Sequence, residues 1–87
     1  MMKVKNSCKY FYDSVYDDLL IRLNDSGSVY SDEVYNNIYL IKSEEDDSIV
    51  GTQILNFKKR SNKVLKEYLP SFIYSIVRDI ETDIYGK

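Results

Sequence analysis

Residues 49–84 have the sequence IVGTQILNFKKRSNKVLKEYLPSFIYSIVRDIETDI, in which the spacing of the apolar residues changes partway along. At the start, Val50, Thr52 and Ile54 alternate with the residues between them, which is the period-two pattern of a strand with one buried face. From Val64 onward, apolar residues recur every three or four positions, the spacing of one face of a helix. This stretch therefore predicts a last strand followed by a helical segment.

Two residues predict irregularities within this stretch. Pro70 lies inside the helical pattern, where it has no backbone N–H and its ring would clash with the carbonyl group of Lys66. We expect either a helix kinked at Pro70 or a helix split there, with a short helix near 61–68 and a longer one from Pro70. Gly51, inside the strand pattern, indicates a bulge or the close approach of another backbone.

The first half of the chain predicts four or five short strands. They cover residues 4–12, 19–23, 29–34, 38–41 and 49–57. Asn6 interrupts the alternation of the first strand, so a bulge or a late start is expected there. Asn24–Gly27 predicts a hairpin, because Gly, Asn and Asp tolerate positive φ, and Asn36–Asn37 predicts a second tight turn. Since no crossover helix separates the strands, we expect an antiparallel β-meander packed by the C-terminal helix. The prediction is one α+β domain over 1–87, with the sheet in 1–57 and the helical part in 58–87.

The composition is typical of a small globular protein. The chain has 87 residues, a net charge of −2 and 44% hydrophobic residues, which is too apolar and too close to neutral for a disordered chain. No apolar run approaches the roughly 18 residues of a membrane span, and no basic start precedes an apolar signal-peptide core. We therefore expect a cytoplasmic protein with no membrane contact.

The inventory of reactive residues is short. The chain has no His, one Cys and three Gly, which leaves no His-dependent triad, no His or multi-Cys zinc site and no glycine-rich phosphate loop. Cys8 shares its strand parity with Val4, Tyr10 and Tyr12, so we expect it to be a small buried hydrophobe. We predict that the protein is not an enzyme and binds no cofactor.

Two acidic clusters could supply oxygen ligands to Mg²⁺ or Ca²⁺. One comprises Asp13, Asp17 and Asp18, and the other is Glu44–Asp47. The second cluster is consecutive in sequence, so its side chains should splay apart, and the spacing of a calcium loop is absent. We interpret both clusters as solvated turn carboxylates and predict no metal site.

The segment 58–66 is basic and contains no acidic residue. Residues 1–57 hold five basic and ten acidic residues, whereas 58–87 hold seven basic and four acidic ones. Cations at a helix start oppose the helix dipole, so something is expected to compensate them. The alternatives are the protein's own acids, an acidic partner surface, or the phosphates of a nucleic acid. The candidate contact residues are Lys58, Lys59, Arg60, Lys63 and Lys66.

Apolar residues are in excess in the helical segment after Pro70. Their stripe is wider than the roughly 100° that a helix needs to cover one sheet face, and Tyr is favoured at protein interfaces. The candidate interface residues are Phe72, Tyr74, Ile76, Val77, Ile80 and Tyr85. We expect a homodimer, or a monomer whose helix docks on another protein; the alternative is an ordinary core with scattered surface Tyr.

Two segments carry a family resemblance. Residues 12–23 (YDSVYDDLLIRL) and 49–56 (IVGTQILN), the latter followed by the basic Lys58–Arg60, resemble the domain-of-unknown-function 2283 family over about residues 10–60. Thr52 and Gln53 depart from that family, which usually has isoleucine and glutamate there. The resemblance implies a small β-rich intracellular protein, sometimes encoded beside toxin-like genes. It implies no established activity and no functional residues.

Two functional hypotheses follow from these features. The first is a small non-catalytic protein-binding module, antitoxin-like or an inhibitor or regulator from a mobile element or virus, which acts by covering the surface of a protein target. The alternative is a nucleic-acid-binding regulator that uses the basic 58–66 segment, although the negative net charge argues against it.

Overall fold

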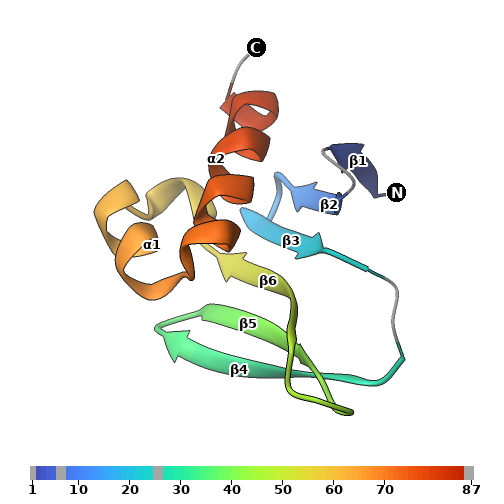
Figure 1. Ribbon diagram of the computed structural model, residues 1–87. Coiled ribbons are helices and arrows are strands. Elements are labelled where there is room, and N and C mark those ends of the chain that lie inside the picture. The colour runs from blue at the N-terminus through green and yellow to red at the C-terminus, as the bar shows by residue number, and fades with distance from the viewer. Residues whose placement is uncertain (1, 6–7, 25–26, 86–87) are drawn as a thin grey trace.

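The computed structural model describes residues 2–5, 8–24 and 27–85, and within these ranges six strands form one antiparallel sheet (Figure 1). The strands are β1 (Lys3–Lys5), β2 (Cys8–Asp13), β3 (Asp18–Arg22), β4 (Val29–Tyr35), β5 (Ile38–Ser43) and β6 (Ile49–Leu55). A 3₁₀ turn, η1 (Phe57–Lys59), then leads to α1 (Asn62–Tyr68) and α2 (Ser71–Tyr85). The predicted α+β class is confirmed.

The sheet is not one continuous meander. Its strand order is β1-β2-β3-β6-β5-β4, so β3 pairs with β6 and not with the next strand along the chain. The predicted hairpin at Asn24–Gly27 is therefore wrong, because this connection crosses to the far edge of the sheet (Figure 1); Asp25 and Ser26 lie outside the described residues. Pairing of β3 with β6 instead sets Leu19 opposite Ile54 near the centre of the sheet.

The strand predicted over residues 4–12, with a bulge or a late start at Asn6, is in fact two strands. β1 and β2 are separate antiparallel strands, with Lys5 opposite Cys8. Asn6, where the irregularity was expected, lies outside the described residues, as does residue 7. Val4 is 69% exposed and does not share the buried face of Cys8. This division gives six strands in the described ranges, more than the four or five predicted.

The helical part consists of two helices. α1 ends at Tyr68 and α2 begins at Ser71, with Leu69 extended before Pro70, as steric contact with the proline ring favours. Ser61 caps α1, since its hydroxyl accepts a hydrogen bond from the backbone N–H of Val64 at 3.2 Å. Neither helix of the described chain has the length and apolar character to cross a membrane.

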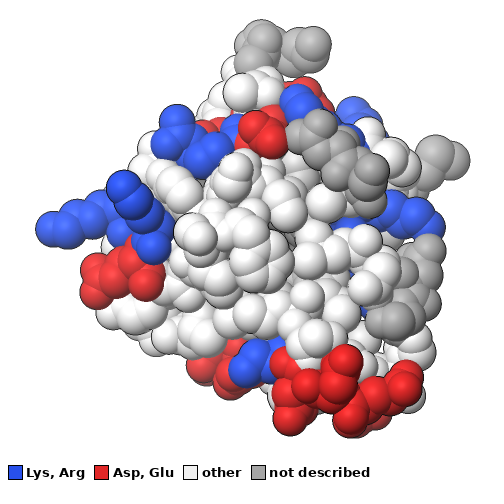
Figure 2. Space-filling view, in the orientation of Figure 1, with Lys and Arg blue, Asp and Glu red and all other residues white. Residues whose placement is uncertain are grey.

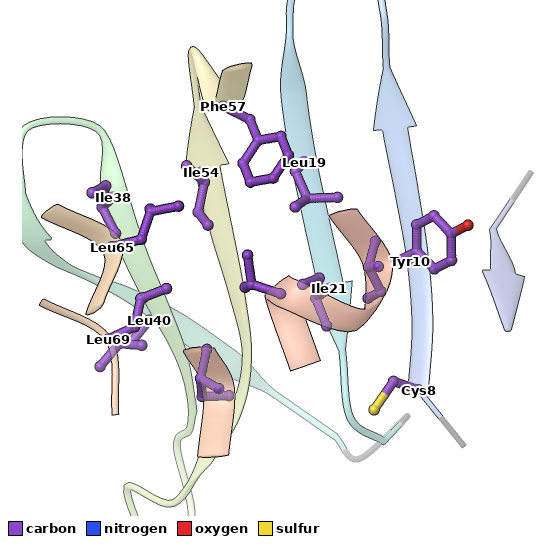
Figure 3. Close-up of a cluster of buried hydrophobic side chains, with 13 residues drawn as sticks. Cys8, Tyr10, Leu19, Ile21, Ile38, Leu40, Ile54, Phe57, Leu65 and Leu69 are labelled. Atoms are coloured by element: carbon purple, nitrogen blue, oxygen red, sulfur yellow. The ribbon is translucent and has the colours of Figure 1, made fainter. Parts of the chain in front are cut away.

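One hydrophobic core lies between the sheet and the two helices (Figure 3). The confirmed buried position of Cys8 is at its edge, next to Tyr10. The remaining members are Leu19, Ile21, Ile38, Leu40, Ile54 and Phe57 from the sheet side and Leu65, Leu69, Ile73, Val77 and Ile80 from the helices.

Both helices therefore cover the same face of the sheet. Because side chains alternate between faces along a strand, the residues between the core positions lie on the opposite face, over which the described chain places no helix (Figure 1). We call this opposite surface the helix-free face. Its residues in the four inner strands are Lys9, Phe11, Asp13, Asp18, Leu20, Arg22, Tyr39, Ile41, Gly51, Gln53 and Leu55.

The tight connections depend on Asn and Asp. Among the described residues, the positive-φ positions are Asp17, Asn37, Asp47 and Asn56, and these two residue types tolerate a left-handed backbone best after Gly. The predicted tight turn at Asn36–Asn37 is confirmed between β4 and β5.

Candidate functional site

Lys58, the first residue of the basic segment, is held by the protein itself. Its Nζ atom lies 5.6 Å from the ring centroid of Tyr12 and 5.2 Å from that of Tyr85, within the range of cation–π attraction. Its backbone N–H donates to both carboxylate oxygens of Asp17, at 3.1 and 3.0 Å. The same carboxylate accepts a 2.6 Å hydrogen bond from the Tyr12 hydroxyl. Asp17 thus joins the turn between β2 and β3 to the start of η1.

The other cations of the segment divide into two groups. Arg60 is partly buried and its Nε–H donates to the carbonyl oxygen of Leu55 at 3.1 Å. Lys59, Lys63 and Lys66 are exposed, and none forms an ion pair within the described part of the chain. Figure 2 shows basic side chains over α1, away from the acidic side chains gathered over the connection between β5 and β6. Three of the five predicted contact residues therefore remain open to a partner.

Tyr12 has a strongly raised pKa. Burial is the largest cause, followed by the hydrogen bond to Asp17, and together they raise the pKa of Tyr12 to about 12. Tyrosine in an unfolded chain ionises near pH 10. The stabilisation from neutral Tyr12 is therefore complete below about pH 10 and is lost as pH rises through about 12.

We expect Tyr12→Phe to remove this part of the alkaline loss of stability, because phenylalanine has no hydroxyl to ionise. The measurement is the free energy of urea unfolding across the interval from about pH 9 to about pH 12. Tyr16→Phe is the control, since it removes an exposed hydroxyl from the neighbouring turn and should keep the wild-type slope. Equal slopes in wild type and Tyr12→Phe would contradict the burial of Tyr12 and its hydrogen bond to Asp17.

An open pocket of about 310 Å³ lies between β2 and the C-terminal part of α2. The Tyr10 hydroxyl donates to Oδ2 of Asp83 at 2.9 Å, and Lys5 Nζ pairs with Oδ1 of Asp83 at 2.9 Å. These contacts connect β1 and β2 to α2. The hydroxyl proton of Tyr10 is donated to Asp83 and is therefore not available to a ligand in the pocket. The lining residues are Lys3, Tyr10, Phe11, Tyr12, Ser14, Lys58, Asp83 and Ile84. The described residues bring no three Cys, Asp or Glu side chains together as a metal site.

The predicted interface on α2 needs correction. Val77 and Ile80 have no exposed surface, because they pack in the core against the sheet, and so they cannot contact a partner. Tyr74 and Ile76 are partly buried against the same core, which accounts for the width of the apolar stripe. The remaining two predicted interface residues are Phe72 and Tyr85, whose side chains are 50% and 45% exposed.

The helix-free face also carries partly exposed apolar residues, which lie outside the predicted interface. Phe11, Leu20, Gln53 and Tyr39 lie opposite one another across four adjacent strands. Phe11 is 39% exposed, and the other three are partly exposed. Phe11, Leu20 and Tyr39 thus form a mainly apolar row across the middle of this face. We call it the apolar row, although it is interrupted by Gln53, whose Nε2 donates to both carboxylate oxygens of Asp18 at 3.2 Å.

Charged residues border the apolar row on β2 and β3. Lys9 lies opposite Arg22 on one side, and Asp13 lies opposite Asp18 on the other. The Arg22 side chain passes over Gly51, because a Cβ added to that glycine would lie 3.3 Å from Arg22 Cδ. The Nε atom of Arg22 is buried and has no hydrogen-bond partner among the described residues.

The two segments behind the family resemblance are neighbours in the sheet. Residues 12–23 contain β3 and residues 49–56 contain β6, and these two strands pair directly. The resemblance to the domain-of-unknown-function 2283 family stays a prediction based on these residues. No protein-family model matches the chain, and no match was found among the curated proteins or the solved structures.

Proposed function

We propose that this protein is a small non-catalytic protein-binding module that acts by surface contact through its helix-free face. The observation that supports this most directly is the apolar row containing Phe11, Leu20 and Tyr39, which no helix of the described chain covers. A solvated face of an antiparallel sheet usually carries polar side chains. An apolar centre with a charged border is instead the arrangement of a protein interface.

The exposed lysines would act at longer range. Lys63 and Lys66 belong to α1, which covers the opposite face of the sheet, so with Lys59 they can attract an acidic protein target but do not contact it on the helix-free face. Complementary charge of this kind mainly raises the rate of association. A target of this kind agrees with an antitoxin-like protein, inhibitor or regulator that neutralises a protein by covering it.

We expect Phe11→Ser to weaken partner binding at least about fivefold, because truncating a central interface aromatic costs roughly 1–4 kcal/mol. Phe72→Ser is the matched control: it makes the same change at a similarly exposed phenylalanine on α2. The measurement is affinity capture with wild type and both variants as baits, followed by titration of any protein retained in stoichiometric amount. Equal retention by all three baits would contradict the proposed use of the helix-free face.

The second candidate function is nucleic-acid binding, which is supported by the exposed Lys59, Lys63 and Lys66 and their lack of ion pairs in the described ranges. If these residues contact phosphates, replacing all three by alanine should reduce the slope of log affinity against log salt by about 2.7 on duplex DNA, at about 0.9 per contact. Fluorescence anisotropy with labelled DNA and RNA measures this slope. Failure of the wild type to bind either one at low salt would remove this candidate.

A further inference from the structure

We infer that the helix-free face packs against the same face of a second copy of this chain, with Arg22 of each copy opposite Asp18 of the other. This inference rests on the proposed function, because it names the occupant of the face that the proposed function uses for protein contact.

The evidence is the order of charges along β2 and β3. β2 presents Lys9, Phe11 and Asp13 on the helix-free face, and the antiparallel β3 pairs each with a residue of the same kind. The face therefore has a basic band, an apolar band and an acidic band, in that order. The pairs are Lys9 with Arg22, Phe11 with Leu20, and Asp13 with Asp18.

This order is costly within one molecule. Like charges directly opposite each other on neighbouring strands destabilise a sheet, and here that occurs on both sides of the apolar band. Within the molecule, Asp18 accepts hydrogen bonds of 3.2 Å from Gln53 Nε2, and Lys9 is not without a partner either. A second copy would add a full opposite charge to these contacts. An identical molecule can supply this opposite charge, because its acidic band can face the basic band of the first, and the reverse.

A two-fold axis along the apolar band brings the bands into register. It places the basic band of one copy over the acidic band of the other, and it places Phe11 and Leu20 against their own counterparts. Such a contact is isologous, the commonest form of a homodimer interface. Stacked sheets lie about 10 Å apart with their strands within about 30°, a gap that an arginine and an aspartate can bridge together.

Gly51 leaves room for the Arg22 side chain, since a Cβ at that position would lie 3.3 Å from Arg22 Cδ. The Nε atom of Arg22 is buried, so a hydrogen bond to a second copy would have to be donated by the terminal N–H groups of the guanidinium. A carboxylate of the second copy would accept from those groups in charge-assisted hydrogen bonds. Phosphate is a poor occupant by comparison, because Asp13 and Asp18 lie on the same face and would repel it.

The test uses two charge reversals, Arg22→Asp and Asp18→Arg. Either one alone sets like charges against each other at both ends of the dimer, so each should weaken self-association at least about 100-fold. An equal mixture of the two variants makes every opposed pair complementary and should form a heterodimer with affinity within about tenfold of wild type. Native mass spectrometry distinguishes the heterodimer by mass, and sedimentation measures the affinities.

Phe11→Ser tests the apolar band without changing any charge, and it should also weaken the dimer. Its control, Phe72→Ser, changes an exposed phenylalanine on α2 and should leave the dimer unchanged. Circular dichroism checks that each variant is folded. Wild type that sediments as a monomer at about 200 µM, some 200-fold above a micromolar dissociation constant, would overturn the inference. So would a mixture that stays monomeric.

The dimer and the proposed function can fail separately. A monomeric wild type that retains a different protein in a Phe11-dependent manner would overturn the dimer alone. A dimer that tolerates Phe11→Ser and both charge reversals would show that the copies meet through another surface, and it would overturn the inference. The proposed function would be overturned as well if no other protein were retained in a Phe11-dependent manner.

Discussion

Replacing Gly51 by alanine should lower the free energy of unfolding by more than about 3 kcal/mol, or prevent folding altogether. A Cβ at this position would overlap the carbonyl oxygen of Ile21 in β3, and it would also lie 3.3 Å from Arg22 Cα. Both obstacles are backbone atoms in the middle of the sheet, which cannot rotate away as a side chain can. For a chain of this length, total stability is roughly 4–13 kcal/mol. Urea unfolding measures the loss.

Gly27→Ala is the matched control for Gly51→Ala. A Cβ at Gly27 would have Glu45 Oε1 as its nearest described neighbour, at 3.7 Å, which is an ordinary contact, and its φ is not positive. We expect a change within about 0.5 kcal/mol. Similar losses in the two variants would contradict the close approach of β3 to β6.

The role of Gly51 was predictable because the signal is local: a glycine inside an alternating strand indicates a bulge or a nearby backbone. Both occur, since β5 and β6 shift register next to Gly51 and β3 approaches it closely. The identity of the neighbouring strand was not predictable in this way. Asn24–Gly27 favours a local hairpin, but pairing with β6 buries Leu19 and Ile21 beside Ile54 and Thr52, and this long-range gain outweighs turn preference.

At the candidate surfaces too, contacts between residues far apart in sequence could not be predicted. Nothing near Lys58 in sequence indicates that Asp17, 41 positions away, fixes its backbone, or that Tyr12 and Tyr85 flank its side chain. The helix-free face did have a sequence signal. The alternate residues 9, 11 and 13 and the alternate residues 18, 20 and 22 become paired bands once the chain turns tightly between Asp13 and Asp18.

Replacing Phe57 by alanine should lower the free energy of unfolding by about 3–5 kcal/mol, the range for a buried phenylalanine. Phe57 is 1% exposed and packs edge-on against Tyr12, with ring centroids 6.3 Å apart. Its ring also lies 6.1 Å from that of Tyr85 in α2. One side chain thus connects β2, η1 and the end of α2, so its removal leaves a cavity that all three must line.

Phe72→Ala is the control, because it deletes the same ring from a position that is 50% exposed, and it should cost less than about 1 kcal/mol. Thermal and urea unfolding of both variants give the comparison. Tyr12 and Tyr85 contact both Phe57 and the ammonium group of Lys58, so the loosened rings should also release that lysine. Equal stability losses at positions 57 and 72 would mean that η1 does not pack into the core, and the cation–π contacts of the Lys58 side chain would then have no packed support.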